Sequence, residues 1–328
     1  MASPVFIITA ISTRGFPPVA PRPDPRVDTL VRVKRLIVNA DDFGLTCGVN
    51  RAIVELNQRG ILTSATLMAV AQAAPEAVSL VRRLPGLGIG CHVVLVDGKP
   101  VLPADQLPTL VNPATGRFRP KLGSFVRDLF LGRIRSKEIE AEAEAQIARL
   151  QAWGLSLTHI DTHKHTHIFP RVLRPLLVAA LKRQIPVIRN PFEPRWSIDA
   201  TFRASPARRT QVRILAQFKP VFQRIVAAAG LSTTDGAIGV LATGTLDPET
   251  LASLLRAMPD GAWELVTHPG YNDNDLALAG TRLLTSRETE RQTLFSAKLP
   301  PGIELIRFSD LAFFNNSTGT SRQPESQR

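Results

Sequence analysis

Four of the six histidines lie in one short segment, between His159 and His167, which also holds Asp161. On an extended backbone alternate side chains point the same way, so we expect residues 159, 161, 163, 165 and 167 to share one face. Imidazole and carboxylate groups together suit zinc, iron, cobalt, nickel or manganese, and magnesium where oxygen ligands and water dominate. The pattern predicts metal binding or catalysis, in preference to histidines that merely make hydrogen bonds or face solvent.

Two adjacent aspartates, Asp41 and Asp42, follow an apolar run and precede Phe43 and Gly44. Neighbouring side chains on a strand point in opposite directions, so one carboxylate can bind a metal while the other reaches water or substrate. Aspartate and glycine are also common in turns, and the pair alone fits a turn equally well.

Two further histidines follow apolar runs. His92 ends a glycine-rich run, where small residues let the backbone approach a ligand or a neighbouring strand closely. His268 precedes Pro269 and Gly270, which stop a strand and permit a tight turn. A histidine with a pKa near neutrality is suited to proton transfer.

Short apolar runs alternate with longer helical patterns along the chain. The runs predict seven strands, at 35–40, 87–95, 155–161, 186–189, 238–242, 264–267 and 303–308. The segments between them predict helices at 49–59, 75–83, 136–153, 172–183, 211–229, 248–258 and 287–294. Ser136 is placed as an N-cap, and Gly154 and Gly230 lie where helices end.

Strand and helix in alternation imply a mostly parallel sheet, which either closes or stays open. The aspartate pair, His92, Asp161 and His268 lie at or just beyond the C-terminal ends of four predicted strands. Active sites of α/β barrels are assembled at that face from several strand ends. We therefore predict an α/β protein with a (β/α) barrel, incomplete or distorted, of about seven strands.

The predicted catalytic domain spans residues 34–314. Prolines among arginines indicate a flexible leader over residues 1–33, and a polar composition indicates a flexible tail over residues 315–328. The chain has two cysteines and no apolar stretch near its start long enough to span a bilayer, which favours a cytoplasmic location. Neither a Walker-A loop nor G-x-G-x-x-G is present, so nucleotide chemistry is not expected.

The formal net charge of +12 predicts attraction to polyanions or anionic lipid. Basic and aromatic residues are not interleaved, so no specific nucleic-acid partner is expected. The segment 211–229 is either a basic amphipathic helix at the surface of the inner membrane or an ordinary barrel helix with a solvated face.

Four motifs together resemble the YdjC-like carbohydrate deacetylases: residues 36–44, 90–92, 158–167 and 267–269. The resemblance runs in order from about residue 34 to 312. Within that family, residues 93–100, Lys164 and residues 189–194 are most similar to the hopanoid-biosynthesis-associated deacetylases.

The resemblance implies a deacetylase-type (β/α) barrel with one divalent metal ion, Mg or Zn, bound by Asp42, His92 and His163. It also implies Asp41 as general base and His268 as the acid that protonates the leaving amine. Asp161 could orient a ligand imidazole from behind, and His165 and His167 match family positions without an assigned role. No substrate-binding residue is assigned.

The function that follows is removal of an acetyl group from an N-acetylated amino sugar, in particular the N-acetylglucosaminyl group of a hopanoid lipid. Soluble chito-oligosaccharides or other N-acetyl sugars are the alternative substrates. A non-catalytic, metal-stabilised module that binds membrane or nucleic acid is an alternative of another class. Whether the chain forms a homodimer is left open.

Overall fold

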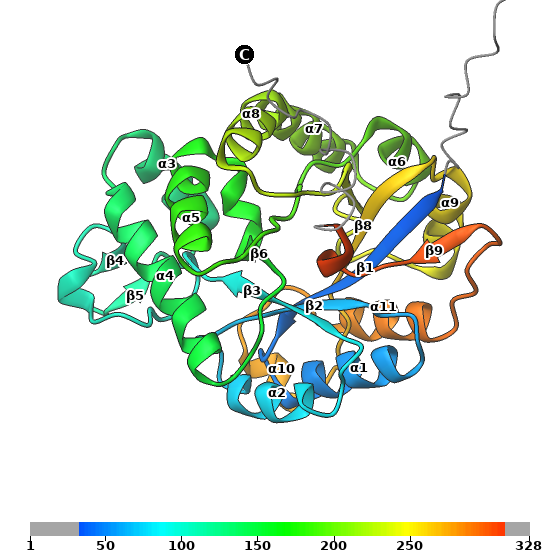
Figure 1. The fold of residues 1–328 in the computed structure, drawn as a ribbon, viewed down its shortest axis with the longest axis horizontal. Coiled ribbons are helices and arrows are strands. Elements are labelled where there is room, and N and C mark those ends of the chain that lie inside the picture. Colours follow the sequence, from blue (N-terminus) through cyan, green and yellow to red (C-terminus); the bar gives the residue numbers. More distant parts are fainter. Residues whose placement is uncertain (1–32, 312–328) are drawn as a thin grey trace, which may run out of the picture. The chain divides into compact units, whose positions relative to one another are not determined.

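The computed structural model describes residues 33–311. The predicted leader, apart from its last residue, and the predicted tail lie outside the described residues. Helices surround a central set of strands (Figure 1). Among residues 33–311, no helix is long and apolar enough to cross a membrane.

Parallel strands form the central sheet in the order β6-β3-β2-β1-β8-β7. They are β1 (Lys34–Phe43), β2 (Ser64–Leu67), β3 (Gly88–Val93), β6 (His159–Thr162), β7 (Gly236–Ile238) and β8 (Gly261–Thr267). The last strand, β9 (Ile303–Leu305), pairs with the start of β1, whereas β2 pairs with the end of β1. The curled sheet with its helices is the predicted incomplete (β/α) barrel.

The barrel is distorted between β6 and β7, where segment 187–192 takes the place of a regular strand. Ile160 and Ile188 form an isolated parallel bridge, and the N–H of Ala237 donates to the carbonyl of Phe192 at 3.2 Å. The strand predicted at 186–189 is therefore reduced to single bridges. Nearby prolines lack the N–H groups that a ladder requires, which explains the irregularity.

One further strand was missed, and two predicted strands lie at other residues. Strand β2, Ser-Ala-Thr-Leu, was not predicted, because it is short and half polar. Strand β6 begins at His159, later than residue 155, and β7 ends at Ile238, where the predicted strand 238–242 begins. These short strands are held by their neighbours in the sheet rather than by strong local preference.

Six predicted helices are present: α1 (Cys47–Gln58), α2 (Ala74–Val81), α4 (Ser136–Ala152), α5 (Pro170–Lys182), α9 (Pro248–Ala257) and α11 (Thr285–Phe295). Ser136 is the first helical residue of α4 rather than its N-cap, and its side chain makes no capping hydrogen bond. Gly230 caps α8 with a left-handed φ of 72°, as expected of a glycine at a helix end.

The single helix predicted at 211–229 is wrong. The structure divides it into α7 (Pro206–Leu215), the 3₁₀ turn η3 (Ala216–Phe218) and α8 (Lys219–Ala229). Pro220 lies in the first turn of α8, where a missing N–H removes no helical hydrogen bond. The proline thus starts a new helix instead of kinking a long one.

Several short elements were not predicted because they lie in long connections. They are α3 (Leu122–Phe130), α6 (Arg195–Ala200), α10 (Asn274–Leu278), the 3₁₀ turns η1 (Ala104–Gln106) and η2 (His163–Ile168), and the hairpin of β4 (Val111–Asn112) and β5 (Arg117–Phe118). Of these, η2 carries part of the histidine cluster.

Strand β1 is buried on both faces, as expected for a central parallel strand. Leu36 and Val38 belong to the main apolar core, whereas Ile37 packs in a second cluster with Val187 and Phe308. Apolar packing on both sides fixes the strand, and the two aspartates follow at its C-terminal end. The core therefore determines where the polar end of β1 lies.

Candidate metal centre and active site

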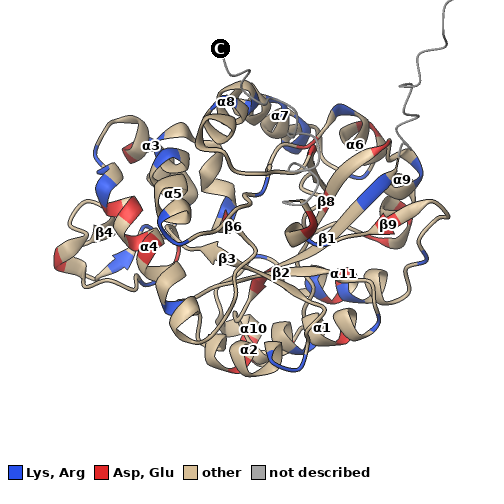
Figure 2. Ribbon diagram, viewed as in Figure 1, with Lys and Arg blue, Asp and Glu red and all other residues tan. Residues whose placement is uncertain are grey.

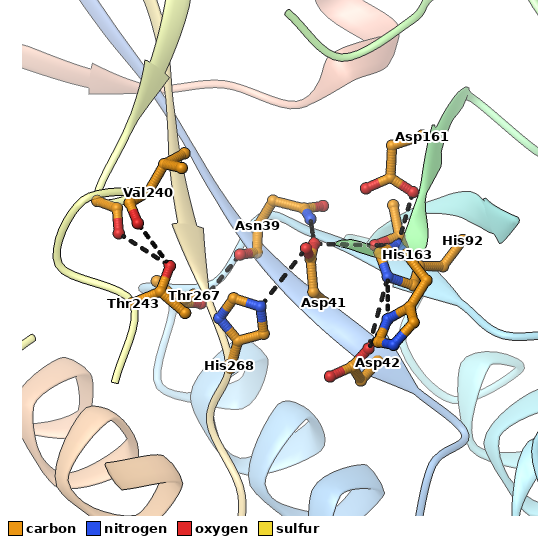
Figure 3. Close-up of polar contacts among 12 residues, drawn as sticks. Asn39, Asp41, Asp42, His92, Asp161, His163, Val240, Thr243, Thr267 and His268 are labelled. Atoms are coloured by element: carbon orange, nitrogen blue, oxygen red, sulfur yellow. Dashed lines mark hydrogen bonds and ion pairs between the residues drawn. The ribbon is translucent and has the colours of Figure 1, made fainter. Parts of the chain in front are cut away.

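The structure brings most of the predicted site residues together at the carboxyl ends of the strands. Asp41 and Asp42 come from β1, His92 from β3, Asp161 from β6, and His268 follows directly after β8. Figure 3 shows Asp42 beside His92 and His163, and His268 turned toward Asp41. One end of the barrel therefore holds both the candidate metal ligands and the candidate proton-transfer groups.

Asp42, His92 and His163 each bring one ligand atom to within 4.8 Å of the other two. Oδ1 of Asp42 lies 3.4 Å from Nε2 of His92 and 3.2 Å from Nδ1 of His163, and the two nitrogens are 3.4 Å apart. Three ligand atoms placed about 2.1 Å from one ion, at right or tetrahedral angles, lie roughly 3.0–3.4 Å from one another. The observed spacing fits a single divalent ion.

The burial of Asp42 supports the same interpretation. Its carboxylate is 3% exposed, and Oδ1 is buried without a hydrogen bond to any described residue. A buried carboxylate oxygen without a donor is costly unless a cation satisfies it. The residues present therefore suit a metal ion that takes an aspartate oxygen and two imidazole nitrogens.

Local backbone geometry aims two of these ligands. Asp42 has a φ of 64°, and the register of β1 against β2 shifts between Ala40 and Phe43. This bulge turns the Asp42 carboxylate toward His92 and His163, while Asp41 remains directed at other partners. Non-glycine residues adopt positive φ rarely, and such strained positions are enriched at functional sites.

The histidine segment is not extended, which corrects the prediction that residues 159–167 share one face. Strand β6 ends at Thr162, and the turn η2 follows with Lys164 and His165 at φ values of 57° and 52°. The turn points His163 at Asp42. The remaining histidines of the segment face other directions.

His92 is held from behind by Asp161. Nδ1 of His92 donates to Oδ1 of Asp161 at 2.7 Å, which leaves Nε2 to face Asp42. Burial lowers the pKa of His92, but the charges of Asp161 and Asp41 outweigh it and raise the pKa to about 9. A carboxylate behind an imidazole in this way fixes the ring and strengthens it as a ligand.

Arg189 joins three carboxylates in the barrel interior. It donates to both oxygens of Asp41, at 2.9 and 2.6 Å, and to Oε1 of Glu264 at 2.8 Å, and it forms an ion pair with Asp161. Its side chain is fully buried. Burial favours the neutral acid of Asp41, but Arg189 holds the pKa of this carboxyl well below its usual range. Asp41 is therefore ionised at neutral pH.

His268 lies beside Asp41 on the cavity side. Its Nε2 is 3.7 Å from Oδ2 of Asp41, and its backbone N–H donates to Oε2 of Glu290 at 2.6 Å. Burial lowers the pKa of His268 to about 4, against the opposing charges of Asp41 and Asp42. The imidazole is therefore neutral at pH 7.

The other three histidines are not brought to the candidate metal position. His159 stacks on Phe308, with ring centroids 3.8 Å apart. His167 is fully buried, and its Nδ1 lies 2.7 Å from Oγ1 of Thr162. His165 lines the cavity, and its buried Nδ1 has no hydrogen bond to a described residue. Only His165 among them can reach a bound substrate.

A cavity of about 500 Å³ opens at this end of the barrel. Asp41, Asp42, His92, His163 and His268 line its polar part. The rest of the wall is mixed. Ile168, Phe192, Val212, Leu215, Val240 and Leu283 line it together with charged residues that include Lys164, Glu193, Arg208 and Arg282. The cavity therefore offers one ligand both the candidate reactive groups and apolar surface.

Two buried arginines belong to the site but were not predicted from the sequence. Arg189 contacts Asp41, and Arg287 contacts Asp42 through a hydrogen bond of 2.5 Å to Oδ2. Arg189 follows the apolar residues Val187 and Ile188, and a charge at the end of a buried run was the available signal. Arg287 lies in an ordinary helical sequence, where nothing distinguishes it from surface arginines.

Fold and site together define a barrel protein with an Asp-His-His candidate metal centre at the carboxyl ends of its strands. The sequence profile of the YdjC-like protein family matches residues 35–304, and the chain belongs to this family.

Two relatives match over nearly their whole length. A carbohydrate deacetylase of Brevibacillus brevis is 35% identical over 283 residues, covering 84% of this chain and 99% of its own. A chitooligosaccharide deacetylase of Proteus mirabilis is 29% identical, covering 84% of this chain and 98% of its own. A crystal structure from Enterococcus faecalis V583, of a protein to which cleavage of cellobiose phosphate has been ascribed, has a TM-score of 0.67 at 27% identity, over 85% of this chain and 99% of its own.

Proposed function

We propose that the protein is a metal-dependent hydrolase that removes the acetyl group from an N-acetylated amino sugar. The observation that carries this proposal is that a candidate metal site and an aspartate–histidine pair lie side by side in one cavity. Asp42, His92 and His163 form the candidate metal site, and the Asp41–His268 pair lies beside it. Membership of the YdjC-like family and the carbohydrate deacetylases among its relatives support the same reaction class.

A divalent ion held by Asp42, His92 and His163, Mg or Zn, would polarise the acetyl carbonyl and lower the pKa of a water molecule. The protein groups then handle two protons. Asp41, kept ionised and in place by Arg189, accepts a proton from the attacking water. His268 donates a proton to the leaving nitrogen, so that acetate and a free amino sugar result.

The contact between Asp41 and His268 connects these two transfers. His268 is neutral in the resting protein, because burial lowers its pKa to about 4. It must therefore gain a proton before it can donate one. Oδ2 of Asp41, 3.7 Å from Nε2, is the neighbouring group from which the water-derived proton can pass. A purely structural metal site would not require such a pair, which argues against a non-catalytic binding module.

The finer proposal is that the sugar is lipid-linked, in particular the N-acetylglucosaminyl group of a hopanoid lipid. The apolar wall formed by Val212, Leu215 and Val240 supports it, because an apolar aglycone needs such a surface. Helix α7, which supplies part of this wall, also carries the exposed residues Arg213 and Ile214 side by side, and this favours peripheral contact with anionic membrane at the cytoplasmic side.

Basic and acidic residues are interspersed over the outer helices (Figure 2). The basic residues are not concentrated on one side of the molecule in this view.

Soluble chito-oligosaccharides are the second candidate substrates, since a relative in Proteus mirabilis is named for them.

Acetate release tests the proposal. The substrates are an N-acetylglucosaminyl hopanoid and chitobiose, each assayed after chelation, with and without added Mg²⁺ or Zn²⁺. We expect release by the wild type to need metal and to fall by at least about 100-fold in Asp41→Asn. Asp199→Asn, at an exposed aspartate that pairs with Arg195, is the matched control and should retain activity.

The outcomes separate the proposals. Faster release from the lipid than from chitobiose supports the lipid-linked substrate, and the reverse order supports the soluble one. Metal-independent release would overturn the mechanism. No release from either substrate, by a protein that binds metal, would overturn the deacetylase proposal.

A further inference from the structure

The two oxygens of Asp42 have different partners. Oδ1 faces the imidazoles of His92 and His163, whereas Oδ2 accepts a hydrogen bond of 2.5 Å from Arg287. Burial alone would raise the pKa of Asp42, but Arg287 and His163 hold it well below the usual range. The only carboxylate among the three candidate metal ligands is thus already paired with the guanidinium of Arg287.

Arg287 cannot easily leave this position. It lies in the first turn of α11 and is 1% exposed. Its Nε donates to the carbonyl of Leu283 at 3.2 Å, and its own carbonyl accepts from the N–H of Gly270 at 3.2 Å. Withdrawal of the guanidinium would break the contact with Leu283 and leave a buried carboxylate unpaired, which is strongly unfavourable.

We propose that Arg287 competes with the divalent ion for Asp42 and thereby sets the metal affinity of the site. This inference rests on the metal site of the proposed function. With Oδ2 occupied, Asp42 offers the ion one oxygen, and the ion and the guanidinium share one negative charge. The two cations also repel each other across the carboxylate.

Two effects of removing the arginine act in the same direction. The carboxylate would give its full charge to the ion, which strengthens binding. In the metal-free protein, Asp42 would lose its counter-charge, so the ion would also relieve a buried unpaired carboxylate. An arginine that merely supported the fold would have the opposite effect, because its loss would disorder the ligands and weaken binding.

The arrangement also bears on reactivity. An ion whose carboxylate ligand is shared with Arg287 retains more of its positive charge, so it polarises a carbonyl more strongly. Arg287 is therefore a positioning residue that lowers affinity and raises reactivity. Removal of Arg287 should therefore raise the metal affinity and lower the reactivity.

Calorimetric titration of metal-free protein with Zn²⁺, against a competing chelator, tests this inference without an activity assay. We expect Arg287→Met to lower the Kd for Zn²⁺ by about tenfold or more, and its kcat to fall. Arg287→Lys keeps a cation and should stay within about threefold of the wild-type Kd. Arg291→Met is the control, because Arg291 lies on the same helix but pairs with Glu55 and Glu288.

An unchanged or higher Kd in Arg287→Met overturns the inference. Should that variant not fold, Arg287→Gln removes the charge with a polar side chain, and the same tightening is required of it. The same experiments distinguish failure of this inference from failure of the proposed function. A wild type that binds no Zn²⁺ overturns the metal site itself, whereas a wild type that binds Zn²⁺ without deacetylating any sugar overturns the function and leaves the affinity comparison valid.

Discussion

Arg189 and Asp41 are 148 positions apart in the chain, yet they form two hydrogen bonds of 2.9 and 2.6 Å inside the barrel. The guanidinium holds both carboxylate oxygens at once, which fixes the plane of the carboxylate as well as its charge. Arg189 also reaches Asp161, the residue behind His92. One buried arginine therefore connects the candidate proton-transfer pair with the candidate metal ligands.

Arg189→Met should lower both stability and activity. The substitution leaves Asp41, Asp161 and Glu264 buried without their shared cation, and breaking such pairs costs about 3–5 kcal/mol. It also frees the Asp41 carboxylate, so kcat/KM should fall by at least about 100-fold. Urea unfolding and acetate release measure the two effects.

The matched control is Arg183→Met. Arg183 pairs with Glu144 at 3.0 Å, and both side chains are partly exposed. Exposed pairs contribute at most about 1 kcal/mol, so this variant should remain close to the wild type. Equal losses of stability in the two variants would contradict the role given to the buried cluster.

His163→Ala and His165→Ala should differ sharply in metal binding, although the two residues are close neighbours in the same turn. His163 directs Nδ1 at Oδ1 of Asp42, 3.2 Å away, whereas His165 is not among the candidate ligands. Loss of a direct ligand should weaken Zn²⁺ binding by more than about 100-fold, and loss of His165 by less than about threefold. Similar weakening in both variants would place the ion elsewhere.

The contrast between these two histidines shows what the sequence can and cannot specify. Apolar runs followed by polar residues place Asp42 and His92 at strand ends, because parallel strands present their carboxyl ends at one face. The directions of His165 and His167 depend on the positive φ of Lys164 and His165, which no residue type at those positions demands. The alternation of side chains expected on a strand therefore located the segment 159–167 correctly but predicted the wrong directions for some of its side chains.

The buried arginines mark a second limit. Arg189 and Arg287 are typical surface residues by type, and they are stable in the interior only because carboxylates from distant parts of the chain surround them. This charge compensation arises only in the folded chain, so it cannot be predicted from the residue types alone. Strand β2 is similar, since Ser64–Leu67 extends only by pairing with β1 and β3.

His167 should make the protein sensitive to acid. Burial lowers the pKa of His167 to about 3, while an unfolded chain has the ordinary value of 6.5. A depressed pKa contributes stability that is present above pH 6.5 and is lost as the pH falls from 6.5 toward 3. The loss for this residue should reach about 3 kcal/mol near pH 4.

Comparison of wild type with His167→Gln isolates this contribution. The comparison is needed because burial raises the pKa of Glu193 to about 7, and such a carboxyl acts in the opposite direction. Denaturant unfolding at pH 7 and pH 4 should show a smaller acid loss in the variant. Parallel losses in both proteins would mean that His167 is not held neutral.

Gly90→Ala should displace His159 and, through it, strand β3. A Cβ at Gly90 would lie 2.5 Å from Nε2 of His159, whose ring is held against Phe308. The cost should be about 1–3 kcal/mol, with a fall in Zn²⁺ affinity because His92 lies two residues further along. Gly86→Ala, where a Cβ meets nothing within 4 Å, is the control.

The double variant Gly90→Ala/His159→Ala tests the cause. Removal of the ring should relieve the clash, so the double variant should be less destabilised than the sum of the two single variants, by about 1 kcal/mol or more. Strict additivity would show that the alanine acts by another route.

The apolar end of the cavity can be tested with two adjacent residues of α7. Leu215 lines the cavity, whereas Ile214 beside it is 61% exposed. Leu215→Trp should fill space that a lipid aglycone occupies and raise the KM for the lipid-linked sugar by about tenfold. Ile214→Trp adds the same side chain outside the cavity and should leave this KM unchanged.

Chitobiose gives the decisive comparison for Leu215→Trp. A short sugar bound at Asp42 and His268 does not need the apolar wall, so its kcat/KM should change by less than about threefold. A selective loss on the lipid would assign this wall to the aglycone, because the chemistry at the polar end would be intact. An equal loss on both substrates would mean that the tryptophan disturbs the reactive end, and no loss on either would mean that the lipid lies elsewhere.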